Sequence, residues 1–358
     1  MDDREDLNPA ALLIPYLMVM AAALLPLLVL RHRVRSAWRR RTPVAPQTWN
    51  LLHFLACYLL FIVLLGTASA VLQAGGFFEL LYGPTLGTRD VTSPDAWGAV
   101  GGGMIADRAL VNSKTVDQLR MLWGAIVAVP LVLFAVHGPA VAFGRRVSAY
   151  TPRDLVDDVL VGLAVAVVAL PLVLVVHVVA LYGHRALGGV AVDHPLTRLG
   201  AGSQWWETTV FWLSVCVLIP WVEELLFRGL LLRWAMSSLG ASLLVFALAF
   251  VFAAAPGFEW NPRVGPLTLV VAALLFVLGF HRFGKTSRRR TVAGVLATSA
   301  LFAAAHTPVW PSPIPLFVLG AILGLCVVKS GRITSAVVVH GFFNSVSFVY
   351  LIRNGPLG

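Results

Sequence analysis

Long apolar segments recur along almost the whole of this 358-residue chain, and they constrain its fold more than any other feature. Crossing the hydrocarbon core of a bilayer takes about 20 mostly apolar residues in a helix. Hydrophobic residues make up 58% of the chain and charged residues only 12%, whereas soluble domains hold about 25% charged residues. A soluble protein of this length could not bury so many apolar side chains, because its surface must stay largely polar. The sequence therefore excludes a soluble enzyme and predicts an all-α fold, a polytopic helical bundle in a membrane.

The apolar runs predict about ten spanning helices, and because several late runs are short we expect between about eight and ten. The runs are Pro9–Leu30, Trp49–Gln73, Met121–Gly144, Asp158–Gly183, Trp206–Met236, Ala241–Pro256, Pro266–His281, Val292–His306, Ile314–Val328 and Ile333–Ile352.

The spacing of these runs predicts how the chain is organised. We expect residues 1–205 to form an N-terminal membrane region of about four spans with a long loop at 74–120. Residues 206–352 are expected to form a helical core, followed by a short tail at 353–358. Between the third and fourth runs, residues 145–158 predict a short interfacial helix, capped by Thr151 with Pro152 at its first position.

Arginines follow the first apolar run in a dense cluster, six of them between Arg31 and Arg41. Cytoplasmic loops of membrane proteins carry an excess of Lys and Arg, so we place this cluster in the cytoplasm and the N-terminus outside. The same orientation leaves most of the 27 Lys and Arg residues on the cytoplasmic side. Loops at a membrane surface then explain the formal charge of +10, and we expect no nucleic-acid partner. The expected location is a bacterial inner (cytoplasmic) membrane.

Two adjacent glutamates, Glu223 and Glu224, are the only carboxylates well inside an apolar run, in the segment WVEELLFRGLLL. Ionisable groups inside a bilayer are costly, so each is a candidate functional residue. Arg228 follows Glu224 by one helical turn and can neutralise it. Glu223 is then left to face another partner. Pro220, three residues before Glu223, is expected to kink the helix beside the pair.

Two histidines in later apolar runs have informative neighbours one turn away. Asn344 follows His340 by four residues and shares its helix face, and Phe302 precedes His306 by four. Counted from the cytoplasmic ends of their helices, Glu223 and His306 lie at a similar depth of roughly 20 Å, whereas His340 is nominally only about 10 Å deep. We expect Glu223, His306 and His340 to form one polar centre, with tilt or a longer inner loop bringing His340 to it.

Three kinds of chemistry fit such a centre. In hydrolysis, Glu223 would take a proton from an attacking water and His306 would orient that water or the base. His340 and Asn344 would donate to the developing oxyanion. In a second interpretation, a glutamate and the histidines hold a divalent metal. Because no HExxH motif occurs, these ligands would come from separate helices. A third reading is the proton or ion path of a transporter, against which the lack of an inverted repeat argues.

The same residues resemble the motifs of the CPBP intramembrane protease family, which includes CAAX prenyl proteases and bacteriocin-processing or bacteriocin-immunity proteins. EELLFR at Glu223–Arg228 is similar to EExxxR, FAAAH at Phe302–His306 to FxxxH, and HGFFN at His340–Asn344 to HxxxN. The motifs occur in the family's order within residues 206–352. The stretch 240–290 departs from the pattern, because it holds an extra helical pair between the first two motifs.

The resemblance implies an all-helical core that hydrolyses peptides at or within the membrane. It implies that Glu223 is the water-activating base and that Glu224 is its partner. The other implied roles are a structural counter-charge for Arg228, a structural role for Phe302, a place in the catalytic centre for His306, and oxyanion donation for His340 and Asn344.

The expected cofactor and substrate follow from the same resemblance. We expect no tightly bound cofactor; if zinc is present instead, its ligands are Glu223, His306 and His340. The expected partners are the lipid bilayer and a membrane-associated peptide or protein as substrate. The alternative functions are a non-catalytic membrane scaffold or bacteriocin-immunity-like protein that retains the motifs, and a transporter.

Overall fold

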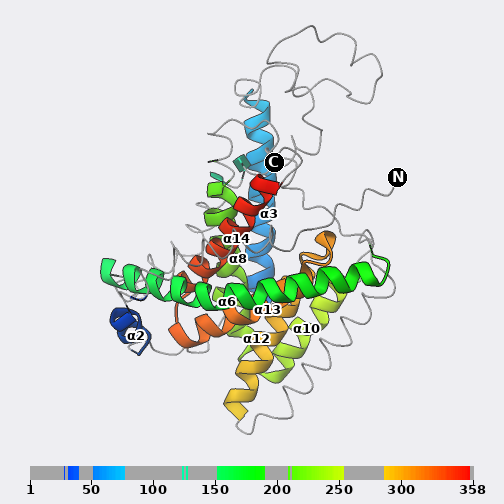
Figure 1. The fold of residues 1–358 in the computed structure, drawn as a ribbon. Coiled ribbons are helices and arrows are strands. Elements are labelled where there is room, and N and C mark those ends of the chain that lie inside the picture. The colour runs from blue at the N-terminus through cyan, green and yellow to red at the C-terminus, as the bar shows by residue number, and fades with distance from the viewer. Residues whose placement is uncertain are drawn as a thin grey trace. The chain divides into compact units, whose positions relative to one another are not determined.

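In the computed structural model of this chain, the described residues are 28, 31–39, 51–76, 123–124, 126–127, 151–189, 209, 212–253 and 286–354. Every regular element in this part of the chain is a helix, which confirms the predicted all-α class (Figure 1). The helices are α2 (Arg31–Arg39), α3 (Leu51–Ala74), α6 (Pro152–Ala186), η5 (Ser214–Leu218), α8 (Ile219–Glu224), η6 (Leu225–Leu231), α9 (Leu232–Ala235), α10 (Leu239–Ala253), α12 (Thr286–Ala304), η7 (Thr307–Val309), α13 (Pro313–Ser330) and α14 (Thr334–Asn354).

Three of the described helices are long and apolar enough to cross a membrane, namely Phe54–Ala74, Pro152–Ala186 and Pro313–Ser330. Two shorter apolar helices span Leu239–Ala253 and Thr334–Val349. The chain is thus a helical membrane protein. The predicted spans at 9–30, 121–144 and 266–281 lie wholly or almost wholly outside the described residues, as do nearly all of the 74–120 loop and the second half of the 240–290 pair.

The chain divides into two compact units. One comprises Met1–Leu55, Ser148–His194 and Glu223–Val346, and the other comprises Ala56–Val147, Pro195–Val222 and Ser347–Gly358. All of the predicted site residues belong to the first unit. The second contributes most of α3, whose outward side chains are apolar, such as Leu59 at 63% and Val71 at 64% exposed.

Helix α6 begins as the sequence predicts but runs much further. The Thr151 hydroxyl accepts from the Asp154 backbone N–H, the Asp154 carboxylate accepts from the Thr151 backbone N–H, and Pro152 opens the helix. These contacts form a capping box. The prediction of a separate short helix ending at 158 is wrong: α6 continues through the apolar run as one helix of 35 residues. No residue after Pro152 interrupts helical geometry there, and Pro171 is accommodated inside the helix.

The two faces of α6 are both apolar. One face packs in the core, where Val161 and Val173 are fully buried. The opposite face exposes Val168, Leu172, Val175 and Val179 at helical spacing. A helix that is apolar all round belongs in a large core or a membrane, so the exposed stripe is expected to face lipid.

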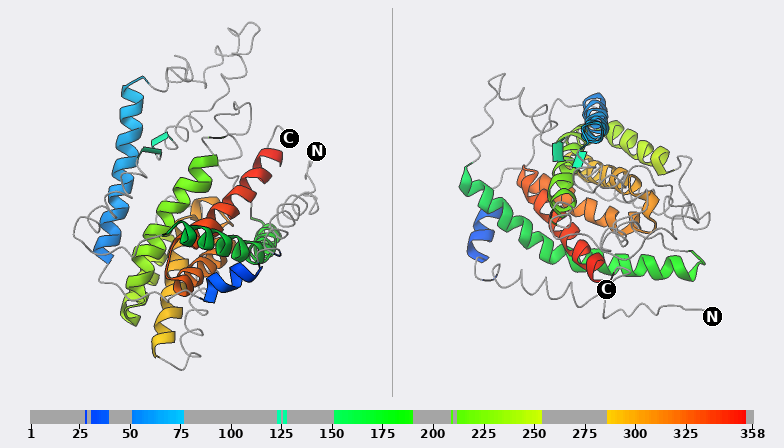
Figure 2. Two further views of the ribbon diagram at one scale, coloured as in Figure 1. Left: turned by 90° about the vertical axis from the view of Figure 1, so that its left-hand side faces the viewer. Right: turned by 90° about the horizontal axis from the view of Figure 1, so that it is seen from above.

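The core of the first unit lies where α12 packs between α10 and α13 and where α6 crosses α13 (Figures 1 and 2). Its buried apolar residues come from α6, α9, α12, α13 and α14: Ala166, Leu170, Val173, Leu232, Met236, Val295, Leu319, Leu323, Val327, Ala336, Val339 and Val346. This packing fixes the helices that carry the candidate site.

The run 206–236 was predicted as one long span, and its described part contains two π-helical stretches. Residues Ser214–Leu218 and Leu225–Leu231 are π-helical and flank the six-residue α-helical segment that contains Pro220. A proline removes one backbone donor, and π-helical turns often occur at functional sites. The glutamate pair ends the α-helical segment and Arg228 lies in the π-helical stretch that follows.

Three aspartates at the start of α6 bind arginines from two other segments. Arg332 Nη1 lies 2.9 Å from Asp154 Oδ1 and 3.8 Å from Asp158 Oδ2. Arg33 Nε, on α2, lies 3.2 Å from Asp157 Oδ1. The sequence reasoning took the glutamate pair as the only carboxylates well inside an apolar run, but Asp157 and Asp158 are buried as well. This cluster joins three segments that the sequence places in the cytoplasm.

Candidate active site

Glu224 and Arg228 form a buried ion pair on one helix, as their spacing predicts. Arg228 Nη1 donates to Glu224 Oε1 over 2.9 Å, and both side chains are at most 1% exposed. The second terminal nitrogen of Arg228 donates to the backbone carbonyl of Gly320 on α13 over 3.3 Å. A fully buried charge needs this degree of pairing because its desolvation is costly.

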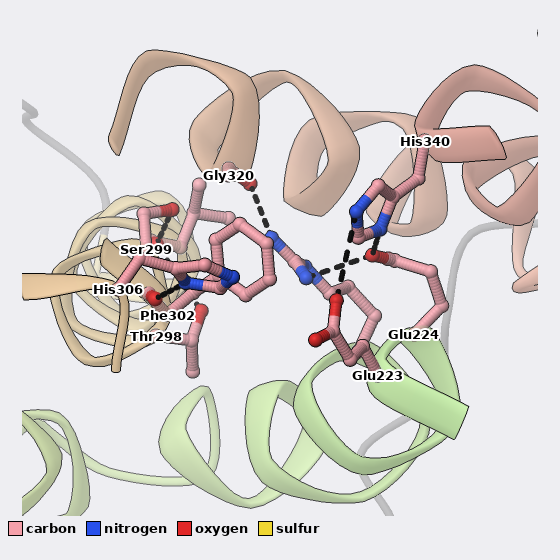
Figure 3. A network of polar contacts seen from close by, with 10 residues as sticks. Glu223, Glu224, Thr298, Ser299, Phe302, His306, Gly320 and His340 are labelled. Carbon is pink, nitrogen blue, oxygen red and sulfur yellow. Dashed lines mark hydrogen bonds and ion pairs between the residues drawn. The ribbon is translucent and has the colours of Figure 1, made fainter. Parts of the chain in front are cut away.

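The guanidinium of Arg228 also rests on an aromatic ring. Its central carbon lies 4.4 Å from the ring centroid of Phe302 on α12, which is fully buried. At Gly320 an added Cβ would lie 3.2 Å from Arg228 Nη2 and 3.1 Å from Ser299 Cβ. A glycine at this position therefore leaves room for the close approach of α13, whose carbonyl meets the arginine (Figure 3).

His340, on α14, connects the two glutamates. Its Nδ1 lies 3.0 Å from Glu224 Oε1, and its Nε2 lies 3.5 Å from Glu223 Oε2 (Figure 3). Because an ionised carboxylate can only accept, Nδ1 carries a proton that it donates to Glu224. Nε2 is then the atom through which His340 interacts with Glu223, as an acceptor in the neutral ring and as a donor in the imidazolium.

The two adjacent glutamates lie in different environments. The Glu224 side chain is fully buried, whereas the Glu223 side chain is 24% exposed. Glu224 Oε1 is held by Arg228 and His340, while Oε2 has no hydrogen-bond partner among the described residues. Glu223 is thus the more accessible carboxylate, and Glu224 orients its neighbours.

His306 lies just beyond the C-terminal end of α12, where it borders the site. Its Nδ1 lies 2.8 Å from the backbone oxygen of Phe302, which can only accept, so Nδ1 carries a proton and the neutral ring has its lone pair at Nε2. Its ring lies 4.9 Å from the Phe302 ring, and that ring lies 5.6 Å from the ring of His340. Figure 3 shows the His306 ring beside the ring of Phe302.

The structure therefore assembles most of the predicted centre. Glu223, Glu224 and His340 are in direct contact, and both histidines contact Phe302. The nominal depth mismatch of His340 does not keep it from the glutamates, because distance along a helix equals depth only where helices are parallel. Asn344 lies one turn beyond His340 on α14 and is half-buried; its oxyanion role stays a prediction.

A catalytic zinc site usually has three protein ligands that converge on one point. Within the described ranges, no group of three or more His, Cys, Asp or Glu side chains is arranged to hold a metal ion. Both ring nitrogens of His340 face carboxylates, and His306 contacts the site across Phe302. The alternative of a zinc site stays a prediction.

Sequence reasoning missed the carbonyl of Gly320 as a partner of Arg228. A signal was present, because Gly320 and Gly324 form a GxxxG spacing in an apolar helix, and such spacing marks close helix approach. An added Cβ at Gly324 would lie 3.2 Å from Val295 Cγ1 on α12. The two glycines therefore mark where α13 packs tightly against α12.

Comparison with known proteins covers the region that holds this site. Residues 205–287 and 279–346 match the family model described as type II CAAX prenyl endopeptidase Rce1-like. The matched region is less than half of the chain and includes all of the predicted site residues. No curated protein and no solved structure matches the chain.

Proposed function

Because residues 205–346 of this chain belong to the CPBP family, the family of the Rce1-like type II CAAX prenyl endopeptidases, we propose that the protein is an intramembrane endopeptidase in which Glu223 activates the attacking water. The family is one of membrane proteases, which implies a peptide or protein substrate in the membrane. The observation that carries the finer proposal is the contrast between Glu223, 24% exposed, and Glu224, fully buried and paired.

The proposed first step is addition of water to the scissile carbonyl. Glu223 takes one proton from the water while the water oxygen bonds to the carbonyl carbon. The negative charge that develops on the carbonyl oxygen is stabilised by the Asn344 amide and by Nε2–H of protonated His340. His306, whose Nε2 carries the lone pair, orients the water.

The proposed second step breaks the carbon–nitrogen bond. The proton that Glu223 took from water passes to the leaving amine nitrogen, and the carbonyl re-forms. Glu224 and Arg228 take no part in proton transfer in this scheme. They hold His340 through its Nδ1, so that Nε2 keeps its place beside Glu223.

The test compares membranes from cells that express the wild-type chain, Glu223→Gln or Asp154→Asn. Asp154→Asn is the control, because it removes a carboxylate charge on α6, outside the site. A membrane peptide or protein that is cleaved in the wild type should accumulate uncleaved with Glu223→Gln and stay processed with Asp154→Asn. Equal processing in all three would support the non-catalytic scaffold instead.

Turnover of the substrate identified in this way then tests the proposed mechanism. Glu223→Gln should lower the rate by at least about 10²-fold, and Asn344→Ala by about 10²-fold with little change in substrate binding, because an oxyanion donor acts mainly in the transition state. Chelators should leave turnover unchanged. Inactivation by a chelator that zinc reverses, together with near-normal turnover of Asn344→Ala, would replace the proposed base mechanism by a metal-dependent one.

We also propose that the N-terminus faces outward and the Asp154–Arg332 end of the unit faces the cytoplasm. The proposal is supported by the contacts of Arg33 and Arg332 with the aspartates of α6, since these three segments must share one side. Single cysteines introduced near Arg332 should react with an impermeant maleimide only after the inner face is opened.

A further inference from the structure

His184 is a buried histidine that the proposed mechanism does not use. It lies in the last turn of α6 and is 4% exposed. The indole Nε1–H of Trp310 donates to its Nδ1 over 3.2 Å. Because an indole nitrogen can only donate, Nδ1 of His184 must accept, and the proton of the neutral ring is on Nε2. The contact itself therefore identifies Trp310 as the donor and His184 as the acceptor.

The His184 ring is enclosed by the end of its own helix. Gly188 has φ +78, the left-handed conformation that ends helices, and the Gly189 N–H donates to the His184 carbonyl over 2.9 Å. The chain thereby turns back over the imidazole so closely that a Cβ added at Gly189 would collide with the ring. The ring therefore has little freedom to move away from Trp310.

Trp310 follows the turn that carries His306. His306 is the N-cap of η7 and Trp310 is its C-cap. The His306 carbonyl accepts from the Val309 N–H over 3.1 Å, and the Thr307 hydroxyl donates to the Ala304 carbonyl over 2.8 Å. The five residues from His306 to Trp310 are thus one compact turn, and Trp310 is 8% exposed.

This turn needs an anchor beyond α12. His306 has φ −106 and ψ 11, outside helical geometry, so it sits where the α12 hydrogen-bond ladder has ended. Helix ends fray when their last groups lack tertiary contacts. The Trp310–His184 hydrogen bond, between residues 126 apart in sequence, supplies such a contact on the far side of the turn.

We propose that His184 is a positioning residue for His306: through Trp310 it fixes the 306–310 turn, and so holds the His306 ring in its place beside Phe302. The proposal rests on the proposed function, in which His306 orients the attacking water. His184 touches no reacting atom itself. Its effect on catalysis passes through the turn alone.

The first experiment measures the turn without using activity. The full-length protein in detergent is treated with diethylpyrocarbonate, and the rate of modification at His306 is followed by peptide mass spectrometry. His184→Leu and Trp310→Phe should each raise this rate by about threefold or more, because loss of the anchor lets the turn open locally. His184→Asn should leave the rate near that of the wild type, because its amide oxygen can accept from the indole at the position of Nδ1.

Two controls separate positioning from general loosening. His177→Leu removes another α6 histidine, two turns earlier, and should not change the rate at His306. His340, 3% exposed, is the internal reference and should stay protected in every variant. An unchanged rate at His306 in His184→Leu and Trp310→Phe would overturn the proposal, as would equal increases at His306 and His340, or failure of His184→Asn to restore the rate.

The second experiment uses the substrate identified from the Glu223→Gln comparison. His184→Leu should lower kcat about tenfold with KM within about twofold, His184→Asn should recover most of kcat, and adding Trp310→Phe to His184→Leu should cause no further loss. Fully additive losses, or a change in KM alone, would overturn the proposal. If the wild type cleaves nothing, the proposed function fails, and the modification rates still decide whether His184 positions His306.

Discussion

Removal of the Arg228 side chain is the perturbation that the site is expected to tolerate least. Arg228→Ala leaves the fully buried carboxylate of Glu224 with His340 Nδ1 as its one remaining partner among the described residues. Leaving a buried charge uncompensated costs about 3–5 kcal/mol. This range includes the lost contact with the Phe302 ring, 4.4 Å from the guanidinium carbon.

The expected loss is a large fraction of the total stability of most folded proteins, which is about 5–15 kcal/mol. The unfolding entropy of soluble proteins, about 2.1 cal/mol/K per residue, is about 0.75 kcal/mol/K for 358 residues, so each kcal/mol shifts Tm by about 1.3 °C. Arg228→Ala should therefore lower the apparent Tm in detergent by about 4–7 °C and reduce expression. Fluorescence-detected size-exclusion chromatography after heating measures both in unpurified membranes.

Three companion variants test the reasoning. Arg228→Lys should recover part of the loss, because an ammonium keeps the charge but lacks the fork that reaches both Glu224 and Gly320. Arg233→Ala, on the same helix, removes a guanidinium whose Nη2 lies 3.5 Å from the Gly331 carbonyl, and should cost only about 1 kcal/mol.

The third companion is the double variant Glu224→Leu with Arg228→Met. Replacing a buried ion pair by apolar residues of similar volume is often neutral for stability. The double variant should therefore regain most of the lost Tm and stay inactive, since nothing then holds Nδ1 of His340. A wild-type Tm in Arg228→Ala, or a double variant as unstable as the single one, would refute the buried-pair reasoning.

Two further predictions concern the packing that holds the site. Gly320→Ala should destabilise the protein by about 1–3 kcal/mol, because the new methyl group would meet Ser299 and Arg228. Gly183→Ala should be neutral or stabilising, because nothing lies within 4 Å of a Cβ added there. Thermal unfolding in detergent measures the difference between the two variants. Thr151→Ala removes the capping box of α6 and should cost about 1 kcal/mol, with Thr151→Ser close to the wild type; equal Tm values for the alanine and serine variants would show that the cap does not stabilise α6.

Local sequence patterns predicted the local parts of the structure well. The Glu224–Arg228 pair follows from a spacing of four residues, and the start of α6 follows from Thr151, Pro152 and Asp154. Both depend only on helical geometry within one turn. The predicted helix end at residue 158 was wrong, because α6 continues to Ala186. Between the polar first turn of α6 and the apolar run that follows, no residue stops a helix.

Composition and the length of the apolar runs by themselves determined that this protein is an all-helical membrane protein, and that Glu223, Glu224 and Arg228 lie in its interior. Tertiary structure alone decided that His340 contacts Glu224, 116 residues away, together with its neighbour Glu223, and that the Gly320 carbonyl meets an arginine 92 residues away. It also paired His184 with Trp310 across 126 residues. The physical reason is that a helix fixes neighbours at three and four residues along the chain, whereas contacts between helices depend on where they cross and how closely small residues such as Gly320 let them approach.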